Sequence, residues 1–103
     1  MYDAETNNLR LLARALVLLE TEDEAVAFLQ DLCTHKEVRI ISQRLAIAEL
    51  LIYGLPYMKI AETLNNLGIT PSTATIGRVN DIIMRGSGTL KKIIDSGCGA
   101  EGS

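Results

Sequence analysis

The sequence predicts an all-α protein of six short helices. Apolar residues recur at intervals of three and four along most of the chain, and no stretch alternates apolar and polar residues as a strand does. Helix-start motifs, glycines and prolines separate these periodic stretches. Hydrophobic residues make up 48% of the chain, yet it has one Phe and no Trp. The core must therefore consist of Leu, Ile, Val and Ala, which fill the seams between packed helices well.

Two helix-start motifs lie in the first third of the chain. A first helix is expected over residues 3–19, where leucines recur at helical spacing. Thr21 and Glu24 then form a capping box, in which the hydroxyl and the carboxylate each satisfy a backbone N–H of the first turn. Thr34 and Glu37 repeat this motif. The sequence therefore predicts one helix after Thr21 and another, with a broad apolar face, after Thr34.

Glycine and proline set the boundaries of the later helices. The third helix ends near Tyr53, and Pro56 begins a fourth helix that reaches about residue 65. Gly68 suits a turn because it can take a positive φ. Thr70 is expected to cap a fifth helix with Pro71 as its first residue.

These elements predict one compact domain over residues 1–96. The fifth helix should end near Arg85, and a short last helix should cover residues 89–96. The links between the helices are short, and no composition shift marks a boundary between domains. Residues 97–103 are rich in glycine and are expected to form a flexible tail.

Charge is distributed unevenly along the chain. The formal net charge is −3, which argues against a uniformly basic nucleic-acid binder. Residues 1–37 carry eight acidic and three basic side chains, whereas residues 50–95 carry three acidic and five basic ones. An acidic body with a mildly basic second half favours a phosphate-facing surface, with ordinary surface charge as the alternative.

Residues 56–85 have the layout of a helix-turn-helix, two short helices joined by a turn that contains glycine. An ordinary helical hairpin with a capped start has the same layout. The start of the second helix offers short hydroxyls, a small methyl and a guanidinium, all suited to phosphates or base edges. The candidate DNA-binding residues there are Thr70, Ser72, Thr73, Ala74, Thr75 and Arg78. The candidate phosphate contacts are Lys59, Arg85, Lys91 and Lys92.

Three segments carry a resemblance to a known family. Leu67-Gly68 followed by Ala-Thr-Ile-Gly-Arg-Val-Asn at residues 74–80 resembles the turn and recognition helix of the Trp repressor. Residues 44–54 resemble the central helix of that repressor, with its Arg, its Glu-Leu-Leu and its terminal Gly. The longer string over residues 68–80 is similar to the YerC/YecD type of Trp repressor-like proteins. The resemblance covers residues 32–90.

The resemblance implies a six-helix Trp repressor-like fold in which two chains intertwine as a homodimer. It implies a transcriptional regulator of the repressor kind that reads a palindromic double-stranded DNA site with two heads one helical turn apart. Sharing apolar surface with a second copy also suits a chain this small. The alternative is a helical adaptor that keeps the fold and has lost DNA binding.

The resemblance also implies a site for a small-molecule corepressor. Carried over from the Trp repressor, the ligand-binding positions are Thr34, Arg44 and Arg78, since two guanidinium planes can stack on a flat ring and hold a carboxylate. Each candidate also has a simpler explanation: Thr34 as a helix cap, Arg44 as the partner of a nearby acid, and Arg78 as a phosphate contact. Val79 and Ile82 stand where the repressor has Gly and Ser, and the turn before the fifth helix is longer, which favours a drier pocket and an effector other than tryptophan.

No catalytic residues and no metal site are predicted. His35, the single His of the chain, lies inside a capping box, and Cys33 and Cys98 are too far apart in sequence to complete a metal-ligand set with it. No phosphate-binding loop and no dinucleotide fingerprint is present. We therefore expect a protein that is not an enzyme and has no resident cofactor. Two lone cysteines and no apolar leader also predict a cytoplasmic location.

Overall fold

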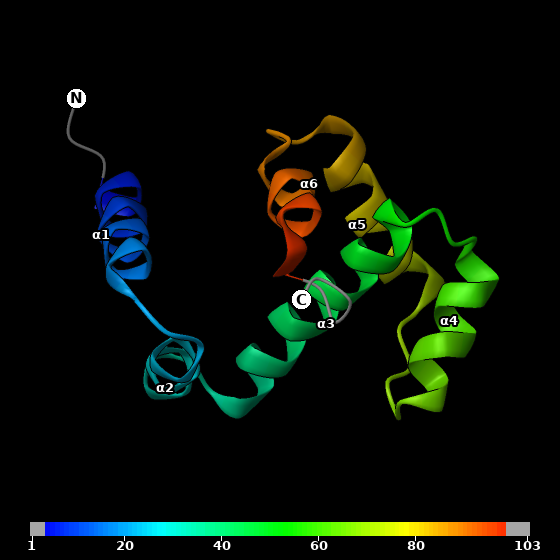
Figure 1. The fold of residues 1–103 in the computed structure, drawn as a ribbon, viewed down its shortest axis with the longest axis horizontal. Helices are drawn as coiled ribbons and strands as arrows, with labels where there is room; N and C mark the ends of the chain where they lie inside the picture. The colour runs from blue at the N-terminus through cyan, green and yellow to red at the C-terminus, as the bar shows by residue number, and fades with distance from the viewer. Residues whose placement is uncertain (1–3, 99–103) are drawn as a thin grey trace. The chain divides into compact units, whose positions relative to one another are not determined.

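The computed structural model describes residues 4–98, which form α-helices, one π-helical turn and no strand. The all-α prediction is confirmed. The elements in chain order are α1 (Ala4–Leu18), α2 (Glu22–Leu32), α3 (His35–Ile52), α4 (Tyr57–Asn66), α5 (Thr73–Arg85), α6 (Thr89–Ile93) and the π-helix η1 (Ile94–Cys98) (Figure 1). The chain divides into two units, Met1–Val38 and Arg39–Ser103. The single domain over residues 1–96 therefore stays a prediction.

The first unit contains α1 and α2 and has no buried side chain among residues 4–38. Val17 and Leu18 are 82% and 74% exposed. A groove of about 380 Å³, which we call the α1–α2 groove, is lined by Asn8, Leu11, Leu12, Ala15, Phe28 and Leu32. Two short helices with no core of their own are marginal in water, so their stability must depend on further packing.

Both capping boxes are present. The Thr21 hydroxyl accepts from the Glu24 N–H at 3.0 Å, and the Glu24 carboxylate accepts from the N–H of Glu20 at 3.0 Å, one residue before the cap. At the start of α3, the Thr34 hydroxyl accepts from the Glu37 N–H at 3.1 Å, and the Glu37 carboxylate accepts from the Thr34 N–H at 2.7 Å. The hydrogen bonds from the Thr34 backbone and hydroxyl lower the pKa of Glu37. This reciprocal arrangement fixes where α3 begins.

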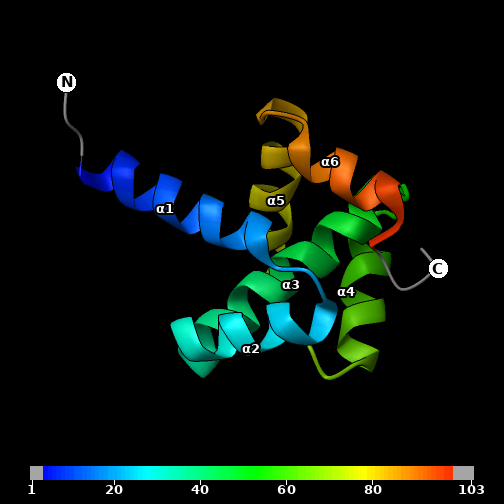
Figure 2. The same cartoon turned by 60° about the vertical axis from the view of Figure 1, so that its left-hand side comes forward.

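The second unit holds the hydrophobic core. Every helix of this unit, together with η1, packs on it (Figure 2). Its fully buried members are aliphatic, as the composition predicts, and they are Ile47, Ala48, Ile60, Leu64, Ile76, Val79 and Ile94. α3, α4 and α5 each contribute two of these residues, so the core holds the helix-turn-helix against the central helix.

The turn between α4 and α5 has a positive-φ glycine, Gly68 at φ +82°, as the sequence predicts. The predicted start of α5 is wrong. Thr70 does not cap the helix and Pro71 is not its first residue, because Ser72 is the N-cap and α5 begins at Thr73. The Ser72 hydroxyl accepts from the Thr75 N–H at 3.1 Å. Of two hydroxyl residues that flank the proline, the later one satisfies the free N–H, so the chain stays extended until Ser72.

The last helix departs from its predicted span. α6 ends at Ile93 and the chain continues as η1, where Gly97 takes φ +94°. Of the predicted tail, Gly97 and Cys98 belong to η1, and residues 99–103 lie outside the described residues. No helix within residues 4–98 is long and apolar enough to cross a membrane.

Candidate nucleic-acid interface

The first turn of α5 presents small polar side chains to solvent. Ser72, Thr73 and Ala74 are exposed, whereas Ile76 and Val79 on the other side of the same helix are buried in the core. The apolar residues are three positions apart, and the helical repeat of 3.6 residues therefore places them on one side of α5 and the polar residues on the other. One face of α5 is thereby fixed on the core and the other is available for contact.

Hydrogen bonds order part of this turn. The Ser72 and Thr75 hydroxyls are hydrogen-bonded at 2.9 Å, with either able to donate, and the Thr70 hydroxyl donates to the Asn65 side-chain oxygen at 3.5 Å. Thr73 makes no side-chain hydrogen bond within the described part of the chain. Among the predicted contact residues, Thr73 therefore has the hydroxyl most readily available to an outside partner.

The basic candidates fall into two groups. Lys59, Arg85 and Lys91 each pair with an acid on their own helix, with N–O distances of 3.7 Å to Glu62, 3.2 Å to Asp81 and 2.7 Å to Asp95. These pairs are predictable from the sequence, because residues three or four apart are neighbours on a helix surface. All are exposed, and such pairs contribute only about 0–1 kcal/mol, so they leave these cations able to exchange partners. Among residues 4–98, Arg78 and Lys92 form no ion pair.

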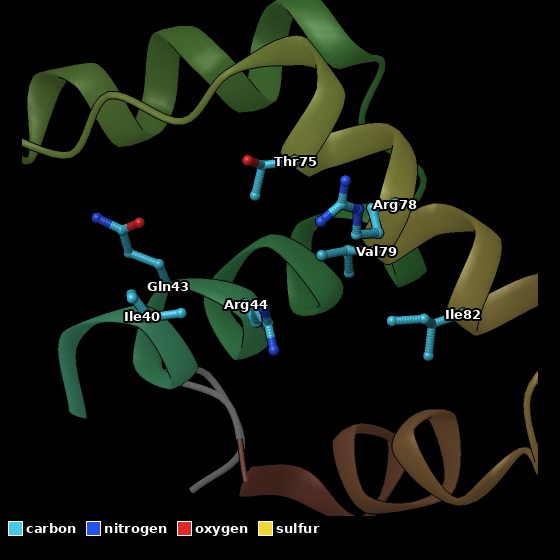
Figure 3. Close-up of a pocket in the computed structure, with 7 residues that line it drawn as sticks. All are labelled: Ile40, Gln43, Arg44, Thr75, Arg78, Val79 and Ile82. Carbon is cyan, nitrogen blue, oxygen red and sulfur yellow. The ribbon is translucent and has the colours of Figure 1, made fainter. Parts of the chain in front are cut away.

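A cavity of about 340 Å³ lies between α3 and α5 (Figure 3). We call it the arginine cavity, and its lining residues are Ile40, Gln43 and Arg44 of α3 and Thr75, Arg78, Val79 and Ile82 of α5. Arg44 and Arg78, which the resemblance pairs, thus meet in one cavity. Thr34 belongs to the first unit, and its side chain is engaged in the cap of α3.

The arginine cavity combines positive charge with apolar walls. Of the lining residues within residues 4–98, the two charged ones are both arginines and none is acidic. Val79 is buried, while Ile82 is 48% exposed and forms part of the wall. Sequence reasoning missed Ile40 and Gln43. Ile40 lies four residues before Arg44 and so shares its helix face, which is the signal that could have found it.

A smaller hollow of about 160 Å³ lies between the start of α4 and the chain that enters α5. We call it the α4–α5 hollow, and it is lined by Tyr57, Met58, Ala61, Pro71, Thr73 and Ile76. No charged residue lines it. Of these residues, sequence reasoning singled out Thr73 as a contact residue and missed Tyr57 and Met58.

No group of three or more His, Cys, Asp or Glu side chains within residues 4–98 is placed to hold a metal ion. The lone His35 is exposed at the start of α3.

Comparison with known proteins gives the same family as the sequence motifs. The family model described as Trp repressor protein matches residues 7–97. The chain is also 34% identical over 84 residues to the "Uncharacterized protein YerC" of Bacillus subtilis (strain 168), an alignment that covers 82% of this chain and 76% of that protein. No solved structure was found to match this chain. The chain belongs to the Trp repressor family, a family of DNA-binding transcription regulators rather than enzymes, and its similarity to YerC places it with the YerC-type members.

Proposed function

We propose that this protein is a transcriptional repressor that binds a palindromic DNA site as a homodimer and uses α5 as its recognition helix. The observation that carries the proposal is the division of α5 into two faces. Ile76 and Val79 fix the helix on the core, and Ser72, Thr73 and Ala74 remain exposed at its N-terminal end. In a helix-turn-helix, the N-terminal residues of the second helix approach the base edges in the major groove.

The exposed end of α5 suits direct contact with bases. Thr73 supplies a hydroxyl that can donate or accept, and Ala74 supplies a methyl that can rest against a thymine. Arg78 lies one helical turn further along, within reach of a phosphate or a guanine edge. Thr75 and Ser72 share a hydrogen bond, so their role is to hold the start of the helix in place as well as to contact DNA.

Phosphate contacts would come from the cations around this face. Arg78 and Lys92 have no ion pair within residues 4–98, and the paired Lys59, Arg85 and Lys91 lose little when they exchange an exposed carboxylate for a phosphate. Each phosphate that the protein neutralises releases condensed counterions. Affinity for DNA should therefore fall steeply as salt rises, with a slope of about −0.9 per phosphate contact in the logarithm of the association constant against log salt.

A homodimer is supported by the first unit. α1 and α2 bury no side chain within residues 4–38, and the α1–α2 groove is mostly apolar. A second copy of the chain would cover this surface and convert two marginal helices into part of a shared core. Two copies related by a twofold axis would also place two recognition helices on half-sites about 34 Å apart.

A corepressor is the finer part of the proposal. Arg44 and Arg78 give the arginine cavity two guanidiniums with no acid among the lining residues, while Val79 and Ile82 add apolar wall. An anion with a flat or branched apolar body fits these walls, because a guanidinium holds a carboxylate in a fork and stacks on a planar group. Filling the cavity would brace α5 against α3 and so fix the recognition helix.

Selection of the purified protein against a pool of randomised DNA duplexes at low salt tests the proposed function. We expect enrichment of a palindrome whose half-sites are about one helical turn apart. The selection is repeated with a metabolite extract to supply a corepressor. If neither selection enriches a sequence, the DNA-binding proposal fails and the helical adaptor is the better description.

The corepressor is tested separately by thermal shift with matched small molecules. Aromatic and branched carboxylic acids should raise the melting temperature, and the corresponding amines of the same shape should not. Arg44→Ala should abolish the shift without changing the melting temperature of the free protein, since Arg44 is exposed. A shift that persists in Arg44→Ala would place the ligand elsewhere.

A further inference from the structure

The α4–α5 hollow is a feature of the helix-turn-helix that the proposed function does not use. Its floor is Ile76, which is buried, and its rim includes Met58, which is 85% exposed on the first turn of α4. After α4 the chain turns back (Figure 1), and this brings Pro71 and Thr73 beside Tyr57. The hollow therefore joins the starts of the two helices.

The hollow is continuous with the proposed DNA-binding face. Thr73 belongs to both, because it lines the hollow and is the first residue of α5. In a helix-turn-helix the first helix crosses the DNA backbone and the start of the second enters the major groove. A recess between these two helix starts lies where the protein meets the edge of the groove.

The chemistry of the lining narrows the choice of occupant. The walls are formed by aromatic, thioether and aliphatic groups together with the hydroxyls of Tyr57 and Thr73, and no lining residue within residues 4–98 carries a charge. Within the major groove, the one apolar group that a base pair presents is the C5 methyl of thymine. A deoxyribose is the other apolar part of DNA, but it is flanked by two phosphates for which this lining provides no cation.

We propose that the α4–α5 hollow recognises a thymine by taking its C5 methyl group, with Met58 closing over the methyl and Thr73 holding the side nearest the base. The flexible thioether chain of Met58 can adapt to such a small apolar group. This inference rests on the proposed function, because it requires α5 to enter the major groove. It assigns Met58, a residue outside the recognition helix, a direct part in sequence specificity.

The test uses the duplex obtained by selection and replaces its thymines one at a time by deoxyuridine, which lacks the methyl and pairs in the same way. One thymine in each half-site should respond with a loss of about fourfold in affinity, the value expected for one buried methyl group. In Met58→Ala the same replacement should have no effect, and its affinity for the unmodified duplex should already be reduced. Met84→Ala is the matched control, since Met84 is 75% exposed near the other end of α5.

The outcomes are distinguishable. If Met58→Ala weakens both duplexes while the deoxyuridine effect persists, Met58 contacts the backbone and the methyl proposal is wrong. If no thymine responds in the wild type, the proposal is also wrong, although DNA binding stands. If the wild-type protein binds no duplex at all, both the proposed function and this inference are wrong.

Discussion

Arg44 of α3 and Arg78 of α5 line the same cavity, although α4 and the turn after it separate them in sequence. Neither arginine forms an ion pair within residues 4–98, and the cavity has no acidic lining residue. Two cations that share a cavity without a counterion favour the binding of an anion there. Arg78 thus lies both on the exposed face of α5 and in the lining of the arginine cavity.

Arg78→Ala should weaken binding of the selected duplex by about 1–3 kcal/mol, which is about 5- to 150-fold in Kd. The melting temperature of the free protein should stay the same, because Arg78 is exposed and unpaired within the described chain. Fluorescence anisotropy at fixed salt measures the affinity. Arg85→Ala is the matched control, since Arg85 lies on the same helix and already pairs with Asp81. Equal losses in the two variants would contradict a specific role for Arg78.

Leu18→Glu should convert a dimer to a monomer. Leu18 is 74% exposed within one protomer, so a charge there costs little in the single chain, but it would be costly beneath a second copy. Sedimentation equilibrium over a range of protein concentrations measures the change. Leu67→Glu, at a position 70% exposed in the second unit, is the control and should remain dimeric. A monomeric wild-type protein would refute the homodimer outright.

Acid should weaken the capping box of α3. Hydrogen bonds from Thr34 lower the pKa of Glu37 in the folded protein below its ordinary value of 4.5. The stabilisation is therefore complete above pH 4.5 and is lost as the pH falls through the lowered pKa. Glu37→Gln should melt at a lower temperature than the wild type near neutral pH, and the gap should close in acid. Melting curves at one protein concentration measure it, and a gap that is constant with pH would contradict the account.

Two glycines of α5 should respond to alanine with opposite signs. A Cβ at Gly77 would meet no atom within 4 Å, so Gly77→Ala should stabilise the helix by about 0.5–1 kcal/mol. A Cβ at Gly86 would lie 2.5 Å from the Ile82 carbonyl oxygen, which is backbone and cannot move aside alone. Gly86→Ala should therefore destabilise the protein. Urea unfolding measures the change in the free energy of unfolding of each variant. Changes of the same sign would show that the end of α5 rearranges.

The sequence could predict elements whose signals are local. Thr34 and Glu37 bind each other across three residues, and this pairing needs no information from the rest of the chain. The start of α5 was harder, because Thr70 and Ser72 can both cap a helix, and Pro71 fits either the first helical position after Thr70 or the extended chain before Ser72. In the structure Ser72 is the cap, and Pro71 before it lines a hollow with Tyr57 and Met58, a tertiary relationship that the local sequence does not specify.

The candidate site was predictable to the extent that family motifs extend over it. Arg44 and Arg78 follow from the resemblance, and the structure brings them to one cavity. Gln43 and the α4–α5 hollow do not follow, because their neighbours come from separate helices. The absence of buried side chains among residues 4–38 was likewise hidden, since the leucine periodicity of α1 is the same whether its partner is this chain or another.

The division of α5 into a buried and an exposed face has a consequence for divergence within the family. Ile76 and Val79 are buried in the core, so most substitutions there destabilise the folded protein whatever their effect on DNA binding. Thr73 and Ala74 are exposed, so they can be substituted at little cost in stability. If α5 reads DNA as proposed, one or two surface substitutions at its exposed end would change the target site while the folded core stays the same.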